Sequence, residues 1–146
     1  MGYDEHTSAS EEAGSVASID FVLDGIEQTL KEVPANKVVN GLPFYTRLWN
    51  VDAAGMISDV QSLPMATAID TVAKAGAQTT WDEATNQNYA EWSAGGGTNK
   101  VWLEDDMSLR SKLEVMRNHN LGGVAVWQLA YSTKSAWEVI NEYYNP

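Results

Sequence analysis

The sequence contains no cysteine, which excludes disulfides and thiolate metal sites. No apolar run approaches the roughly 18 residues of a membrane-spanning helix, so we expect no membrane span. No basic segment followed by an apolar run opens the chain, so we predict no signal peptide, and secretion stays an open question. The two histidines, His6 and His119, have no metal-ligand spacing between them. We therefore expect neither a metal nor another cofactor.

Basic residues are scarce as well. The chain has 9 Lys and Arg against 20 Asp and Glu, which gives a net charge of −11. Such a chain repels phosphate backbones, so we expect no nucleic-acid partner, whereas neutral glycans, peptides and small molecules remain open. No G-x-S-x-G motif or phosphate-binding glycine loop is present. The run Gly95-Gly96-Gly97 reads as a turn, because no helix follows it directly.

The residues that are present indicate one globular domain. The chain has 146 residues, of which 44% are hydrophobic, and six are tryptophan. A domain of this length buries about two-thirds of its unfolded surface, so a real core is possible.

The first part of the chain reads as strand, helix and strand. Residues 1–4 resemble the end of a strand, and residues 5–18 are polar and small, as in a loop. Ser18 is a plausible N-cap for a helix whose apolar residues have helical spacing, and Pro34 should end it. Residues 38–45 are the next predicted strand, which ends in the aromatic and polar residues 45–49.

The second part changes character and predicts a small α+β insertion. A short helix starts near Ser62 and Pro64 and ends at Gly76, and three aromatic segments follow, at 78–81, 88–92 and 99–103. Residues 94–97 read as the hairpin loop between the last two segments. We therefore divide the chain into residues 1–49, an insertion at 50–104, and residues 105–146.

The third part predicts a helix from Asp105, a strand over 121–129 and a closing helix over 135–144. Val124, Ala125 and Val126 include no polar residue, so we expect both faces of that strand to be buried. The repeated strand–helix pattern predicts a parallel sheet, either open or closed into a barrel. Three strands cannot close a barrel and leave edges to cover. We expect the C-terminal portion of a larger protein, or a chain that borrows strands from a second copy.

Aromatic and polar side chains stand at the carboxyl ends of the predicted strands. Tyr3 should point into the mouth of the sheet with Asp4 at its rim, although a core tyrosine and a loop aspartate fit the same residues. Trp127 can stack on the apolar face of a sugar or belong to the core. Tyr45 and Arg47 carry the same two interpretations. The acidic run from Glu104 to Asp106 we interpret as helix capping rather than catalysis.

Four motifs in order resemble the glycoside hydrolases of family 18, which include chitinases and related N-acetylglucosaminidases. Residues 1–4 resemble that family's M-x-Y-D motif of strand six, and residues 41–45 its G-x-P-x-Y motif of strand seven. Residues 101–105 and 121–127 resemble the approach to strand eight and its body. The insertion, with Tyr89 and Trp92 before the glycines, is similar to the bacterial branch that includes spore-cortex and cell-wall glycosidases. The fold implied is an α/β fold, namely strands six to eight of a (β/α)8 TIM barrel, with the insertion between the last two strands.

The resemblance implies retaining hydrolysis of β-1,4 bonds beside N-acetylglucosamine, in chitin or peptidoglycan. In that family the acetamido oxygen of the sugar attacks the anomeric carbon, unlike in the usual two-carboxylate scheme. By resemblance, Tyr3 would hold the acetamido group, Asp4 would contact the sugar near the cleaved bond, and Trp127 would be the floor. Tyr45 and Arg47 would be rim contacts. The implied location is extracellular, in the cell wall or in the spore envelope.

One part of the family pattern is absent. The general acid of the family closes a D-x-x-D-x-D-x-E motif, which does not occur in this sequence. Because a general acid contributes about 10²- to 10⁴-fold in rate, we expect the isolated chain to be inactive. Two other interpretations stay open: a non-catalytic, glycan-binding chitinase-like protein, and a half-barrel that persists by pairing with a second copy.

Overall fold

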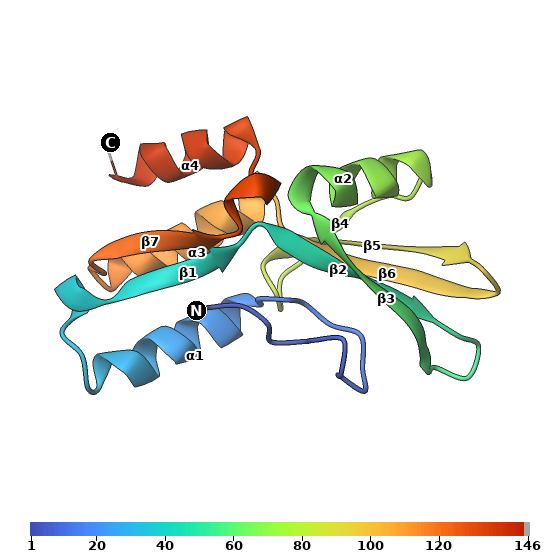
Figure 1. The fold of residues 1–146 in the computed structure, drawn as a ribbon, viewed down its shortest axis with the longest axis horizontal. Coiled ribbons are helices and arrows are strands. Elements are labelled where there is room, and N and C mark those ends of the chain that lie inside the picture. Colours follow the sequence, from blue (N-terminus) through green and yellow to red (C-terminus); the bar gives the residue numbers. More distant parts are fainter. Residues whose placement is uncertain (145–146) are drawn as a thin grey trace.

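The computed structural model describes residues 1–144 and contains two sheets, one parallel and one antiparallel (Figure 1). The parallel sheet pairs β1 (Val39–Pro43) with β7 (Gly123–Trp127), in register from Val39 opposite Gly123 to Pro43 opposite Trp127. This confirms the parallel pairing that the strand–helix pattern predicted. The carboxyl ends of both strands therefore lie at the same edge, where the candidate side chains were expected.

Three long helices lie beside this pair of strands (Figure 1). They are α1 (Ile19–Leu30), α3 (Asp106–Asn118) and α4 (Lys134–Tyr144). Their apolar faces form one core with Leu42 and Phe44 of the β1 segment, and this core includes Ile26, Leu109 and Val139. Ser18 caps α1, and Asp105 caps α3 in a reciprocal capping box with Ser108, so both predicted N-caps are confirmed. Short 3₁₀ turns lie at Ala35–Lys37 and Leu129–Tyr131.

The antiparallel sheet has five strands in the order β3-β2-β6-β5-β4. Helix α2 (Met65–Lys74) packs against it through Ala68 and Val72, which meet Ala90, Val101 and Leu103. The strands are β2 (Tyr45–Val51), β3 (Ile57–Pro64), β4 (Thr80–Asp82), β5 (Gln87–Ala94) and β6 (Gly97–Leu103). The predicted short helix and three aromatic segments are all present. Gly95 and Gly96, both with positive φ, make the hairpin turn between β5 and β6.

Two features of this sheet differ from the prediction. Residues 45–51 form a full strand of the antiparallel sheet, rather than the rim of the strand before them. Strand β3 was missed, because half of the residues from Ile57 to Pro64 are polar and exposed and the run shows no clean alternation. The sheet therefore begins at Tyr45, on the N-terminal side of the division at residue 49. The three-part division stays a proposal, and residues 145–146 of its last part lie outside the described residues.

Two strand predictions were also wrong in detail. Residues 1–4 form no strand: a single bond, from Gly2 N to the Gly41 carbonyl at 3.0 Å, joins them to β1. Strand β7 is not buried on both faces, because Ala125 and Trp127 are exposed. Within residues 1–144, β1 is the single strand that pairs with β7, so the other edge of β7 is open. In the same part of the chain, no helix has the length and apolar character needed to cross a membrane.

Candidate functional site

Four of the five predicted site residues line one open hollow of about 250 Å³. They are Asp4, Tyr45, Arg47 and Trp127. The hollow lies where β1 and β7 end and where β2 of the antiparallel sheet begins. Residues far apart in sequence thus meet at the carboxyl edge of the parallel pair. Tyr3, the fifth residue, does not line the hollow but lies edge-on to Tyr45, with ring centroids 6.2 Å apart.

Asp4 has a backbone conformation that is uncommon for a residue with a side chain. Its φ is +63°, in the left-handed region where Asp and Asn are tolerated better than most residues. Its carboxylate accepts a hydrogen bond from the Tyr45 hydroxyl at 2.5 Å and from Arg47 Nη2 at 2.8 Å, both at Oδ1. The Asp4 side chain is still 47% exposed, so part of the carboxylate faces solvent. Unusual backbone geometry held by such contacts is often found at functional sites.

Arg47 ties three segments of the chain together. Besides Asp4, it donates to the His6 carbonyl from Nε at 2.9 Å and to Ser62 Oγ from Nη1 at 2.7 Å. Its guanidinium also lies 5.7 Å from the centre of the Tyr45 ring. The side chain is only 12% exposed, so it acts mainly within the protein. Arg47 therefore fixes the wall of the hollow more than it offers free donors to a ligand.

The two tyrosines remain protonated well above neutral pH. Burial, and then the hydrogen bond to Asp4, raise the pKa of the Tyr45 hydroxyl. Burial and the Asp4 charge also raise the pKa of Tyr3. Within residues 1–144 the Tyr3 hydroxyl has no hydrogen-bond partner, whereas the Tyr45 proton is used by Asp4. Of these two phenols, Tyr3 is therefore the one whose hydroxyl is not engaged within residues 1–144, whereas Tyr131 is the further phenol that lines the hollow itself.

Trp127 presents a broad apolar surface at the edge of the hollow, with 57% of the residue exposed. Its carbonyl accepts from Phe44 N at 2.7 Å, and its peptide bond to Gln128 is cis. Three further residues that the sequence did not single out also line the hollow: Ser62, Gln128 and Tyr131. Ser62 comes from the missed strand β3, and the other two follow the end of β7. No motif marks them, and only the position of the strand ends could have pointed to Gln128.

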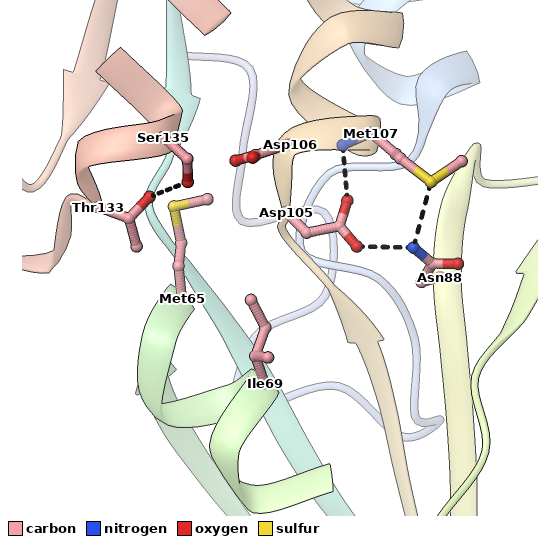
Figure 2. A pocket seen from close by; sticks show the side chains of 8 residues that line it. All are labelled: Met65, Ile69, Asn88, Asp105, Asp106, Met107, Thr133 and Ser135. Carbon is pink, nitrogen blue, oxygen red and sulfur yellow. Dashed lines mark hydrogen bonds between the residues drawn. The ribbon is translucent and has the colours of Figure 1, made fainter. Parts of the chain in front are cut away.

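A second hollow, of about 260 Å³, lies between α2, β5 and the N-terminal ends of α3 and α4 (Figure 2). It contains none of the predicted site residues. Figure 2 shows that Asp105 is engaged in structural bonds, to Met107 N at 2.9 Å and to Asn88 Nδ2 at 2.7 Å. The capping interpretation of Asp105 is thus confirmed. The candidate site is the first hollow.

The chain is similar to known proteins over most of its length. The family model described as "Glycosyl hydrolases family 18" matches residues 1–132. The cortical fragment-lytic enzyme of Bacillus subtilis (strain 168) is 26% identical over 132 residues, which cover 90% of this chain and 31% of that protein. A chitinase from Chromobacterium violaceum ATCC 12472 has a crystal structure that matches with a TM-score of 0.87 at 26% identity, over 100% of this chain and 44% of that one.

A more distant structure shows the same fold. The spore cortex-lytic enzyme SleL of Bacillus cereus is 18% identical and matches with a TM-score of 0.86, over 98% of this chain and 33% of that one. The chain thus spans less than half the length of each of these relatives. The α/β fold is that of family 18 chitinase structures. Because the family model covers nine-tenths of the sequence, from the Tyr3-Asp4 motif past Trp127, this chain belongs to the glycosyl hydrolases of family 18.

Proposed function

We propose that this chain forms one wall of the glycan site of a family 18 glycoside hydrolase. In this proposal it is the C-terminal portion of a (β/α)8 barrel. Residues 1–4 would occupy the place of strand six although they form no strand here, and β1 and β7 would be strands seven and eight. Residues 50–104, with α2 and most of the antiparallel sheet, would be the insertion between the last two. The observation that carries the proposal is the meeting of Asp4, Tyr45, Arg47 and Trp127 in one hollow. Barrel enzymes hold their chemistry at this end of the strands.

The geometry supports a distinct role for each side chain. Trp127 offers an exposed indole face on which the apolar face of a pyranose can pack. The free Tyr3 hydroxyl can donate to the acetamido oxygen of N-acetylglucosamine and hold it for attack on the anomeric carbon. Asp4, oriented by Tyr45 and Arg47, can accept from the sugar or its acetamido N–H. Together they serve a retaining reaction on β-1,4-linked N-acetylglucosamine, in which the glycan itself supplies the nucleophile.

The binding test compares two exposed tryptophans. N,N′,N″-Triacetylchitotriose titrated into the 146-residue chain should bind weakly, with a Kd on the order of 1 mM. Trp127→Ala should weaken binding about tenfold, because one aromatic platform is lost. Trp137, which is 40% exposed and packs on Phe44 away from the hollow, is the matched control. Equal losses in Trp127→Ala and Trp137→Ala would argue against a sugar site at Trp127.

We also propose that the isolated chain does not hydrolyse glycans, because its sequence lacks the D-x-x-D-x-D-x-E motif of the general acid. Incubation with a chromogenic chitobioside should release no product above the spontaneous rate. Any release that Trp127→Ala abolishes would contradict this statement and would show that the acid lies within these 146 residues.

The exposed edge of β7 supports a partner that completes the sheet. Within the described residues, β7 pairs on one side only, with Ala125 and Trp127 uncovered. We propose that the remaining barrel strands occupy this edge, or a second copy of the chain where they are absent. Size-exclusion chromatography tests the second case, in which a clean monomer would count against strand borrowing.

The relatives named for spore cortex and chitin support a glycan of the cell wall or spore envelope as the substrate.

A further inference from the structure

A buried ion pair lies outside the candidate site. Glu104 and Lys112 are 0% and 1% exposed, and Lys112 Nζ lies 2.8 and 3.0 Å from the two carboxylate oxygens. Ser108 Oγ donates to the same carboxylate at 2.8 Å. Burial raises the pKa of the Glu104 carboxyl, and the Lys112 ammonium opposes that rise. Burying two charges carries a large desolvation cost, so a buried ion pair adds little net stability. Stability alone therefore does not account for the Glu104–Lys112 pair.

Gln87 connects this pair to another part of the chain. It is fully buried at the start of β5 and donates from Nε2 to Glu104 Oε1 at 2.8 Å and to the Leu103 carbonyl at 3.3 Å. Its Oε1 accepts the hydroxyl proton of Ser15. Ser15 belongs to the loop of residues 5–18, which follows Asp4 directly. A rigid, charged anchor thus holds a side chain of this loop.

The same hydrogen-bonded path continues from Ser15 to the candidate site. The Ser15 carbonyl accepts from His6 Nδ1 at 2.8 Å. The His6 carbonyl in turn accepts from Arg47 Nε at 2.9 Å, and Arg47 Nη2 donates to Asp4 at 2.8 Å. The Glu104 and Asp4 carboxylates are therefore connected by a series of residues, each of which is hydrogen-bonded to the next.

The 5–18 loop depends on such ties because it has no helix or strand of its own. Its base is closed by Glu5, whose backbone N donates to the Val16 carbonyl at 2.9 Å and whose carboxylate accepts from Ser18 N at 2.7 Å. The residue before Ser15 is held by Trp49, whose indole Nε1 donates to the Gly14 carbonyl at 2.9 Å. Ser15 lies between these ties and is 2% exposed, so its hydroxyl cannot exchange Gln87 for water.

We propose that Gln87 and Ser15 are positioning residues of the glycan site: they hold the 5–18 loop on the antiparallel sheet, and through His6 the loop sets the direction of Arg47 and Asp4. This inference rests on the proposed function for its consequence in binding. The contacts themselves do not depend on that function. The insertion thereby contributes to the site through the 5–18 loop as well as through its own side chain, Ser62.

The test cuts the path at two places. Ser15→Ala removes one hydroxyl, and Gln87→Met keeps the shape of the side chain without its amide. The matched control is Asn88→Ala, which removes the neighbouring bond from β5 to Asp105 (Figure 2), since the Asn88 side chain bonds to Asp105 and Met107 of the α3 start and not to the 5–18 loop. The readouts are the ¹H–¹⁵N signals of Arg47 Nε–H and of the Trp49 indole, urea unfolding, and affinity for N,N′,N″-triacetylchitotriose. The Arg47 signal is assigned from Arg47→Lys.

We expect Ser15→Ala and Gln87→Met to shift the Arg47 Nε–H signal, to speed its exchange with water, and to weaken oligosaccharide binding by up to about tenfold. Asn88→Ala should change neither the Arg47 Nε–H signal nor the Trp49 indole signal. A lower unfolding midpoint in Ser15→Ala and Gln87→Met, with the Arg47 signal and the affinity unchanged, would overturn the proposal and leave a structural role. If the wild-type chain binds no oligosaccharide, the proposed function fails, whereas the Arg47 signal still decides this inference.

Discussion

Asp4 combines a special backbone conformation with a special set of contacts. Its positive φ turns the chain away from β1, directly after the residues that lie beside that strand. The carboxylate then meets Tyr45 and Arg47, so the residue needs both left-handed tolerance and a short acidic side chain. Few residue types meet both conditions, because most side chains in this region clash with the backbone.

Substitution can separate these two requirements. Asp4→Ala and Asp4→Gly lose the same hydrogen bonds, but only alanine meets the steric penalty at φ +63°. We therefore expect Asp4→Gly to be more stable than Asp4→Ala by about 1 kcal/mol in urea unfolding. If alanine proved equal to glycine, the backbone at residue 4 would have to relax, and the strain argument would fail.

The raised pKa of Tyr45 predicts how stability depends on pH. A phenol whose pKa is higher in the folded state contributes stability that is fully present below the ordinary tyrosine pKa of about 10 and is lost as the pH rises toward the folded value. The difference in unfolding free energy between wild type and Tyr45→Phe should therefore be larger at about pH 9 than at about pH 11. Urea unfolding at the two pH values measures it. A constant difference would mean that the folded state does not raise the pKa of the Tyr45 hydroxyl.

At the level of elements, the turn before β7 packs closely against the turn before β1. Gly122 N donates to the carbonyls of Ala35 and Val38, at 2.9 Å each. A Cβ at Gly122 would lie 2.4 Å from the Asn36 carbonyl oxygen, whereas a Cβ at Gly123 would have its nearest contact at 3.6 Å, with Val39. The 3₁₀ turn after α1 and the turn before β7 thus touch backbone to backbone.

These neighbouring glycines make a matched pair of variants. Gly122→Ala should destabilise the chain by about 1–3 kcal/mol, as overpacking against backbone does, whereas Gly123→Ala should stay within about 0.5 kcal/mol of wild type. Urea midpoints of the two variants give the comparison. Similar midpoints would show that the turn at Ala35–Lys37 can move aside.

At the level of the whole molecule, the net charge of −11 outweighs the surface ion pairs. Exposed pairs such as Lys74–Asp70 and Lys134–Glu138 contribute little, while the excess of carboxylates repels across the surface. Raising NaCl from about 10 to about 150 mM shortens the screening length from about 30 to about 8 Å. We expect Tm to rise by a few degrees, and equally in KCl, because screening is non-specific. A fall in Tm would mean that exposed ion pairs dominate instead.

Much of the fold could be predicted because the relevant signals are local. Ser18 and Asp105 are caps that act on the next few residues, and the helical spacing after each is legible without tertiary context. Strand β3 could not be predicted, since its polar and apolar residues do not alternate cleanly and its pairing depends on β2. The strand over 121–129 was expected to be buried on both faces, but Ala125 is exposed, because burial depends on the neighbours of a strand rather than on its own sequence.

The site divides along the same line. The residue pattern alone placed Tyr45 and Trp127 near the carboxyl edge of the parallel pair, since parallel strands end at one edge. Tyr3 and Asp4 reach the same region without forming a strand. Glu104 was interpreted with its neighbours as part of a helix cap. Only the folded chain shows that Glu104 and Lys112 form a buried pair, connected through Gln87 and Ser15 to Arg47. Such contacts join residues up to 72 positions apart, and chain closure over that distance leaves no signature in local sequence.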